Sequence, residues 1–309
     1  MLTRREWLGT AAMLGCAAHV PAAVGMPIID THTHFYDPTR PEGVPWPGKG
    51  DPVLSRPVLP AEFVKLTQPL GVTGTVVVEA SPWIEDNQWL LDLAKTNPVI
   101  VGVVGRLLPS DADFAKHLAR FVKNPKYRGI RINQNEVRAA LESPAQLDRL
   151  KAFSDAGLSL DVNGGPPVLA DAAKLAEKLP KLTIIVNHLG NPLIDGQEPP
   201  KEWRDGLTSA AAQPNVWCKL SALVDSTRKR ERGAPTDLAF YRPVFDAVWK
   251  AFGRKRLMFG SNWPVSDHYA TYPTLFALAS KFVKAQDTAA FADVFGGNAV
   301  TAYQLKVAR

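Results

Sequence analysis

The sequence alternates eight times between a short apolar segment and a segment with helical periodicity. Apolar residues recur at three- and four-residue spacing in the helical segments, as over residues 114–122 and 168–179. The apolar segments are nearly continuous, which is typical of strands buried on both faces of a parallel sheet. We predict strands at residues 28–35, 74–80, 100–107, 128–133, 158–164, 182–190, 216–223 and 256–264. Eight such units predict an α/β fold, a closed (β/α)8 TIM barrel that forms a single domain over residues 26–309.

Two further features narrow the fold. No Gly-x-Gly-x-x-Gly pattern follows the first predicted strand, which argues against a dinucleotide-binding fold. Residues 38–60 are rich in Pro and Gly and predict a long loop after that strand. Both ends of this loop are tied to the barrel, so we expect a lid or a substrate wall rather than a linker. Tyr36 and Trp46 are candidates for stacking on a substrate ring, or for simply covering the barrel mouth.

Residues 1–25 have the composition of an export signal rather than of a folded element. Paired arginines precede an Ala-rich apolar run over residues 8–20 that is too short to span a bilayer, and small residues follow it. The paired arginines resemble a twin-arginine signal, which predicts a periplasmic protein with no transmembrane segment in its mature form. The alternative is a lipoprotein anchored through Cys16, because the Leu-Gly that precedes this cysteine is similar to the end of a lipobox.

The charge distribution bears on the kind of partner. The formal net charge is +6, but Lys and Arg are spread among acidic residues, and no basic stripe with interleaved aromatic residues is present. This pattern argues against nucleic-acid binding. A barrel of this kind predicts a small-molecule substrate as the partner, whereas the oligomeric state is left open.

Polar side chains stand at the carboxyl ends of the predicted strands, where TIM barrels collect their chemistry. His32 and His34 alternate along the first strand and therefore share one face, with Asp30 beneath them. Two such imidazoles can hold a metal, or polarise a carbonyl and a water. The other strands end in Glu79, Arg106, Arg131, Asn133, Asp161, Asn163, Asn187, His188, Lys219, Ser221 and Asn262. Buried strands are otherwise apolar, so these residues predict a polar pocket at one end of the barrel.

Several short segments of the sequence resemble those of a known family. They are Asp30-Thr-His-Thr-His34, Tyr127-Arg-Gly-Ile-Arg-Ile-Asn133, Ile185-Val-Asn-His-Leu-Gly-Asn-Pro192, Cys218-Lys-Leu-Ser221 and Phe259-Gly-Ser-Asn-Trp-Pro264. In this order they resemble the amidohydrolase superfamily, and most of all its lactonase-like branch, which includes sugar-lactone and 2-pyrone-4,6-dicarboxylate lactonases. The resemblance extends over the chain from residue 28 onward. It implies a hydrolase that opens a lactone or similar cyclic ester of a sugar acid or dicarboxylate.

The sequence departs from the family pattern at Asn262. The resemblance implies an acidic residue at the end of the eighth strand, which acts as the base toward the attacking water and as a ligand when metal is present. A carboxamide is neutral, cannot take a proton near pH 7 and is a poor metal ligand beside a carboxylate. The chain therefore hydrolyses with another base, or catalyses a step that needs no activated water, or has lost catalysis. Asp267 is a candidate surrogate base, although loop carboxylates are usually solvated.

The resemblance also bears on metal binding. Binuclear members supply a carboxylated lysine or glutamate from the fourth strand and histidines from the fifth and sixth strands. Here the fourth strand ends in Arg131 and Asn133, and the fifth has no histidine. One divalent metal, with zinc the expected ion, could be held by His32, His34 and His188. We expect either no cofactor or a single weakly bound metal of this kind.

The candidate residues divide into a catalytic group and a substrate-binding group. The predicted catalytic residues are His32, His34, His188 and Asn262. The predicted substrate contacts are Arg131, Asn133, Glu79 and Trp263. The imidazoles would polarise a substrate carbonyl while Asn262 orients water or holds an oxygen. Arg131 would form a bidentate pair with a substrate carboxylate, unless it pairs with Glu79 or Asp161 instead. Lys219 and Ser221 are expected to support the site rather than to act as nucleophiles, because no adjacent base is evident.

Three functions remain open at this point. The first is a periplasmic hydrolase that opens a lactone. The second is a lactone isomerase, in which the substrate's own hydroxyl attacks its carbonyl; the lactonase-like branch is similar in including such an enzyme. The third is a non-catalytic barrel that has kept its small-molecule pocket.

Overall fold

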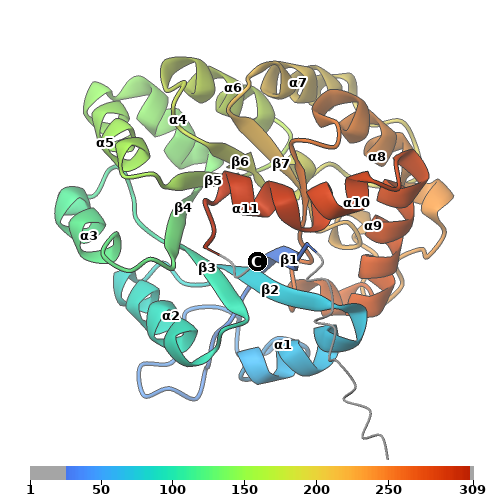
Figure 1. The fold of residues 1–309 in the computed structure, drawn as a ribbon, viewed down its shortest axis with the longest axis horizontal. Helices are drawn as coiled ribbons and strands as arrows, with labels where there is room; N and C mark the ends of the chain where they lie inside the picture. The colour runs from blue at the N-terminus through green and yellow to red at the C-terminus, as the bar shows by residue number, and fades with distance from the viewer. Residues whose placement is uncertain (1–25, 307–309) are drawn as a thin grey trace, which may run out of the picture.

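The structure is a computed structural model that describes residues 26–306. It contains eight parallel strands in the order β1 to β8, with helices around them (Figure 1). The strands are β1 Ile28–Thr33, β2 Val72–Val78, β3 Ile100–Gly105, β4 Tyr127–Asn133, β5 Ser159–Asn163, β6 Ile184–Val186, β7 Val216–Leu220 and β8 Leu257–Phe259. Backbone hydrogen bonds join the ends of β1 and β8, from His34 N to Trp263 O at 2.9 Å and from Asn262 N to His32 O at 2.8 Å. The predicted TIM barrel is confirmed, whereas the predicted export signal at residues 1–25 lies outside the described residues.

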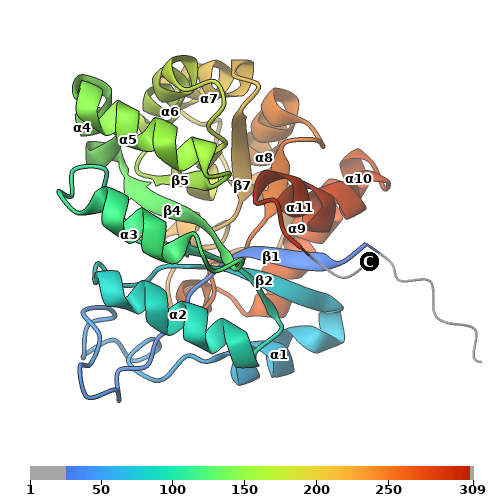
Figure 2. The ribbon, with the colours of Figure 1, turned by 60° about the vertical axis from the view of Figure 1, so that its left-hand side comes forward.

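Most helices form an outer ring around the strands (Figures 1 and 2). The helices are α1 Pro60–Thr67, α2 Ile84–Thr96, α3 Phe114–Phe121, α4 Gln134–Glu142, α5 Pro144–Asp155, α6 Val168–Lys178, α7 Lys201–Ala212, α8 Leu238–Phe252, α9 Tyr272–Gln286, α10 Ala290–Ala292 and α11 Asn298–Ala302. Apolar faces hold them in place. In α3, Phe114, Leu118 and Phe121 are buried at three- and four-residue spacing. No helix within residues 26–306 is both long enough and apolar enough to cross a lipid bilayer.

The end of the chain closes the amino-terminal end of the barrel. Figure 1 shows α11 lying across the ring of strands. A small apolar cluster joins Tyr303 to barrel residues such as Ile29 and Val104. Ser159, the first residue of β5, donates from Oγ to the carbonyl oxygen of Ala302 at 2.5 Å. The polar residues at the carboxyl ends of the strands therefore lie at the opposite end of the barrel.

Strands β6 and β8 are shorter than the sequence predicts, because the backbone turns early. His188 has a φ of 56°, Leu189 a φ of 58° and Asn262 a φ of 63°. These values lie in the left-handed region, where a strand cannot continue and where non-glycine residues are uncommon. Such backbone conformations concentrate at functional sites, where the surrounding structure holds them. Here they turn His188 and Asn262 out of the strand alternation at the end of the barrel that carries the polar residues.

Candidate active site

Three imidazoles meet at the carboxyl end of the barrel. The ring centroids of His32 and His34 are 5.0 Å apart, and those of His32 and His188 are 4.3 Å apart. The three residues are 0%, 5% and 6% exposed, in the order His32, His34 and His188. Gly260 makes room for this arrangement, because a Cβ at that position would lie only 2.9 Å from the Cβ of His32. The structure therefore brings together the three histidines that the sequence singles out.

His32 is held by a buried chain of polar groups inside the barrel. Lys219 Nζ lies 3.3 Å from His32 Nδ1 and donates to Asp161 Oδ2 at 2.6 Å. Tyr303 donates its hydroxyl to the other Asp161 oxygen at 2.8 Å. An ammonium that donates to Nδ1 leaves the imidazole proton on Nε2. His32 Nε2 is buried without a hydrogen-bond partner among the described residues, so it is an unused N–H donor within the site.

His188 is oriented by Ser221, the residue that directly follows β7. Its Nδ1 lies 2.9 Å from Ser221 Oγ, and its backbone N–H also points to that oxygen at 3.2 Å. Burial lowers the pKa of both His188 and His32 well below the ordinary value, and the nearby Lys219 charge adds to this effect. Both rings are therefore neutral near pH 7. Ser221 thus stands within hydrogen-bond distance of a neutral imidazole and fixes the orientation of the His188 ring. Its supporting role stays a prediction.

His34 is fixed from the other side and reaches Asn262. Its Nδ1 lies 2.9 Å from the carbonyl oxygen of Val78, an acceptor only, so the imidazole proton is on Nδ1. Its Nε2 lies 3.3 Å from Asn262 Oδ1. Burial and the charge of Arg131 lower the pKa of His34 to about 3, so the ring is neutral. The lone pair of His34 Nε2 and the oxygen of Asn262 therefore point into one region.

Asp30 anchors the ends of β1 and β8 beneath the imidazoles. Its Oδ1 accepts from the backbone N–H groups of His32 at 3.0 Å and Ser261 at 2.9 Å. Its Oδ2 accepts from the hydroxyl of Tyr272 at 3.0 Å. Complete burial raises the pKa of Asp30 to about 6, against the lowering effect of these hydrogen bonds. Backbone N–H groups and the Tyr272 hydroxyl use both of its oxygens, which makes Asp30 a support for the site.

Arg131 forms an ion pair with Glu79, which is one of the two roles that the sequence leaves open for it. Its Nε lies 3.0 Å from Glu79 Oε1, and its Nη2 donates to the backbone oxygen of Glu79 at 2.7 Å. Arg106 pairs in turn with Glu136, with 2.5 Å between Nη2 and Oε1. Arg131 Nη1 makes no hydrogen bond with another described residue. Nη1 is therefore the Arg131 nitrogen that could donate a hydrogen bond to a ligand.

Two of the predicted substrate contacts have other roles in the structure. Asn133 is exposed and caps α4, accepting from the backbone N–H of Glu136 at 3.1 Å. Trp263 is 0% exposed, with its ring 6.2 Å from that of Phe35 and 5.7 Å from that of Phe63. An exposed cap and a ring with no free surface are poor ligand contacts, so we do not retain either residue among the substrate contacts.

The long loop after β1 covers the histidines. The ring of Trp46 lies edge-on to that of His34, with 5.8 Å between centroids, and contacts Tyr36 at 5.2 Å. The hydroxyl of Tyr36 donates to the carbonyl oxygen of Leu54 at 2.9 Å, which ties the loop to itself. Tyr36 is buried, so of the two aromatic candidates only Trp46 keeps a surface that could contact a substrate.

Sequence reasoning missed Asp225 and Tyr303. Asp225 Oδ1 accepts from Asn262 Nδ2 at 2.8 Å, and Tyr303 completes the hydrogen bonding of Asp161. Asp225 follows the seventh strand by a few residues, and a search of the loops after each strand for carboxylates would have found it. Tyr303 has no comparable signal, because it reaches the barrel interior from the closing segment at the opposite end.

The residues present do not fit the predicted three-imidazole metal site. A zinc ligand needs a free lone pair on the coordinating nitrogen. Lys219 takes up His32 Nδ1 and so places the proton on Nε2, which leaves neither ring nitrogen of His32 with a free lone pair. Within residues 26–306, no group of three or more His, Cys, Asp or Glu side chains is placed to hold a metal ion. We therefore derive no chemistry through a metal.

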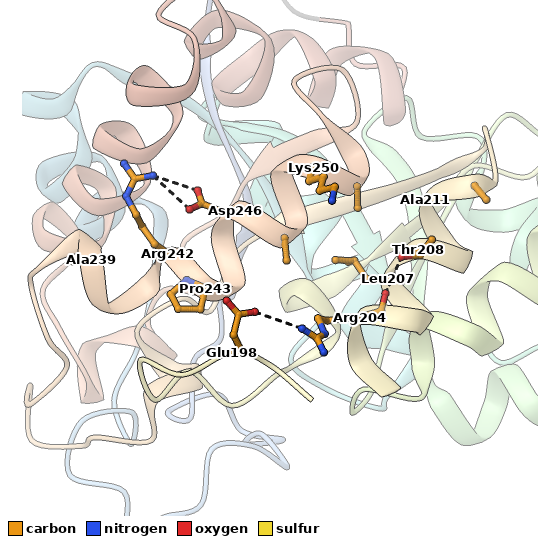
Figure 3. Close-up of a pocket in the computed structure, with 13 residues that line it drawn as sticks. Glu198, Arg204, Leu207, Thr208, Ala211, Ala239, Arg242, Pro243, Asp246 and Lys250 are labelled. Carbon is orange, nitrogen blue, oxygen red and sulfur yellow. Dashed lines mark hydrogen bonds and ion pairs between the residues drawn. The ribbon is translucent and has the colours of Figure 1, made fainter. Parts of the chain in front are cut away.

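A surface groove elsewhere on the molecule has a different character. It lies outside the barrel, along α7 and α8 (Figure 3). Arg204 and Arg242 stand at its edge, each beside an acidic partner, Glu198 at 3.6 Å and Asp246 at 3.3 Å. The rest of its lining is five alanines together with Leu207, Thr208, Pro243 and Lys250. Its lining contains no histidine, and its two arginines are already paired with acidic residues, so the imidazole cluster remains the candidate site.

Comparison with known proteins shows which family this chain belongs to. A family model described as amidohydrolase matches residues 29–305. The L-fucono-1,5-lactonase of Burkholderia ambifaria is 31% identical over 283 residues, which cover 90% of this chain and 95% of that protein. The L-fucono-1,5-lactonase of Burkholderia multivorans is 30% identical over 286 residues, with 90% and 96% covered. A crystal structure of a Burkholderia multivorans amidohydrolase with bound zinc has a TM-score of 0.80 and 28% identity, covering 91% of this chain and 100% of that one. The chain belongs to the amidohydrolase family.

Proposed function

We propose that this chain is a hydrolase that opens a lactone, with a polyhydroxylated sugar-acid lactone as the substrate class. The observation that carries the proposal is the pairing of an unused donor with two converging acceptors. The donor is His32 Nε2, and the acceptors are His34 Nε2 and Asn262 Oδ1. A lactone presents a carbonyl that needs a donor, and its hydrolysis requires a positioned water. Relatives that are L-fucono-1,5-lactonases support the substrate class.

The reaction follows from these groups. His32 would donate from Nε2 to the carbonyl oxygen of the lactone and stabilise the charge that develops there. A water held by His34 Nε2 and Asn262 Oδ1 would attack the carbonyl carbon while His34 takes one of its protons. The His34 pKa is about 3 in the resting site, and the negative charge that forms on the adjacent carbonyl oxygen would raise it during the attack. The bond from that carbon to the ring oxygen then breaks, and the imidazolium of His34 returns the proton to the leaving oxygen. The product is an open hydroxy acid, which Arg131 Nη1 could hold through its carboxylate.

The proposal is tested with the purified protein and a panel of sugar 1,4- and 1,5-lactones, with acid release followed in weakly buffered solution. We expect opening of at least one lactone, and equal rates with and without a chelator, because the site does not depend on a three-imidazole metal centre. Loss of activity on chelation, with recovery on adding zinc, would overturn the metal-free mechanism. A panel without turnover, together with ligand-dependent thermal stabilisation, would favour a binding protein instead.

A second candidate function is lactone isomerisation, and the carboxamide of Asn262 is the observation that favours it. A group that cannot take a proton leaves water unactivated, which suits attack by a hydroxyl of the substrate. Reaction in ¹⁸O-labelled water separates the two functions. Hydrolysis places one solvent oxygen in the product carboxylate, whereas isomerisation places none.

The cellular location is also a proposal. We propose export to the periplasm through the twin-arginine-like segment in residues 1–25, with anchoring through Cys16 as the alternative. Fractionation of cells that express the full chain, with and without the two arginines replaced by lysines, would test it.

A further inference from the structure

Around Asn262, two hydrogen-bond acceptors face each other and a buried carboxyl oxygen has no partner among the described residues. Asn262 Nδ2 donates to Asp225 Oδ1 at 2.8 Å, which turns the carboxamide oxygen toward His34. His34 Nε2 carries no proton, because Nδ1 donates to Val78, so two acceptors face each other at 3.3 Å. Asp225 Oδ2 is buried without a partner among the described residues. Two buried acceptors that face each other repel, and a buried carboxyl oxygen without a donor is costly. These three atoms therefore need an additional hydrogen-bond donor, either a bound group or a proton.

We propose that Asp225 is a positioning residue whose protonation state decides which end of the Asn262 carboxamide faces His34. With Asp225 ionised, the amide nitrogen turns to Asp225 and the oxygen turns to the site, as in the structure. With Asp225 protonated, its O–H donates to the carboxamide oxygen, and the amide rotates by half a turn. Asn262 Nδ2 then donates to His34 Nε2. In both arrangements Asp225 makes a hydrogen bond with the Asn262 side chain, accepting from its nitrogen when ionised and donating to its oxygen when protonated.

The two arrangements differ in what the site can bind. In the ionised form, the acceptors His34 Nε2 and Asn262 Oδ1 converge and can receive both hydrogens of one water. In the protonated form, the amide occupies the lone pair of His34, and the water loses both of its acceptors. This consequence rests on the proposed function, in which that water attacks the lactone. The rate should therefore rise with pH as Asp225 loses its proton.

The surroundings of Asp225 support titration in the neutral range. Burial raises the pKa of Asp225 to about 7, the hydrogen bond from Asn262 lowers it, and the charge of Asp267 raises it. The groups that face it are Asn262 from the turn after β8, Asp267 from the 3-10 turn Val265–His268, and Tyr241 from α8. No basic side chain contributes to this pKa among the described residues. A carboxylic acid with this pKa changes state within the range in which a lactonase is assayed.

A measurement without substrate tests the amide itself. Protein labelled with ¹⁵N at asparagine side chains would be titrated from pH 5.5 to 8.5 by NMR, with the Asn262 signals assigned through their loss in Asn262→Ala. We expect both amide proton signals to shift with a midpoint near pH 7, and to stay constant in Asp225→Asn. Signals that do not respond to pH in the wild-type protein would overturn the inference.

Activity supplies the second readout. We expect wild-type kcat/KM to rise roughly thirtyfold from pH 5.5 to 8.5 after subtraction of spontaneous lactone hydrolysis, as ionisation of one group near pH 7 requires. Asp225→Asn should remove this inflection, leaving a change of less than about threefold. Asp267→Asn is the matched control: it removes a neighbouring negative charge, so the inflection should stay and move to lower pH.

The outcomes separate this inference from the proposed function. If the amide signals titrate with Asp225 but no lactone is opened, the hydrolase proposal fails and the role of Asp225 stands. If a lactone is opened and Asp225→Asn keeps the wild-type inflection, the role of Asp225 is overturned and the hydrolase proposal stands.

Discussion

Replacement of Lys219 by methionine is expected to lower the free energy of unfolding by about 3–5 kcal/mol, because it leaves one member of a buried ion pair without its partner. The side chains of Lys219 and Asp161 are both 0% exposed, and their charged atoms are 2.6 Å apart. In Lys219→Met, the carboxylate of Asp161 keeps only the hydroxyl of Tyr303. Reversible urea unfolding, with tryptophan fluorescence as the signal, measures the loss.

Two further variants make this result specific. Lys201→Met removes the lysine of an exposed pair with Asp205, whose side chains are 74% and 62% exposed, and should cost less than about 1 kcal/mol. The double variant Lys219→Met/Asp161→Asn removes both buried charges, and the new amide can still accept from Tyr303. It should recover most of the loss. A double variant that is as unstable as the sum of the single ones would contradict the ion-pair explanation.

Replacement of His34 by glutamine is expected to lower kcat/KM for the lactone by a factor on the order of 10²–10⁴, the usual effect of losing a positioned general base. Glutamine can still donate to the carbonyl oxygen of Val78, but its amide cannot take a proton from water. The loss should appear mainly in kcat, because proton transfer fails while most substrate contacts remain. Initial rates over a range of lactone concentrations measure this split.

A matched control separates this effect from a general loss of structure. His117→Gln makes the same replacement on α3, where the ring stacks on Phe121 at 6.4 Å and lies outside the barrel. We expect wild-type kcat/KM in that variant. The two proteins should also unfold at similar urea concentrations. If His34→Gln retains activity within about threefold of wild type, His34 is not the base.

The barrel and the imidazole cluster could be predicted from the sequence because both follow from periodicity. A strand places every second side chain on one face, so His32 and His34 project together in any fold that keeps that strand. Eight strand–helix units in a chain of this length favour a closed barrel, and closure brings His188 to the same end. The length of β6 and β8 was less predictable. The sequence around His188 and Asn262 gives no sign that the strand has ended. In the structure the backbone is left-handed at both residues, which ends the strand before them.

The partners of the polar side chains depended on the tertiary structure. From the sequence, Arg131 could bind a substrate carboxylate or pair with Glu79 or Asp161, and the packed barrel places Glu79 against it and Lys219 against Asp161. No sequence period relates a side chain on the turn after β7 to one on the turn after β8, so the contact of Asp225 with Asn262, 37 residues away, appears only in three dimensions.

The sequence by itself determined the topology and the kinds of chemical group at the carboxyl end of the barrel, because local periodicity and strand order are properties of the chain. Only the tertiary structure decided where the protons are. A hydrogen bond depends on distances of a few tenths of an ångström between residues far apart in the chain. The contacts of His32 with Lys219, His34 with Val78 and Asn262 with Asp225 set which nitrogen or oxygen donates.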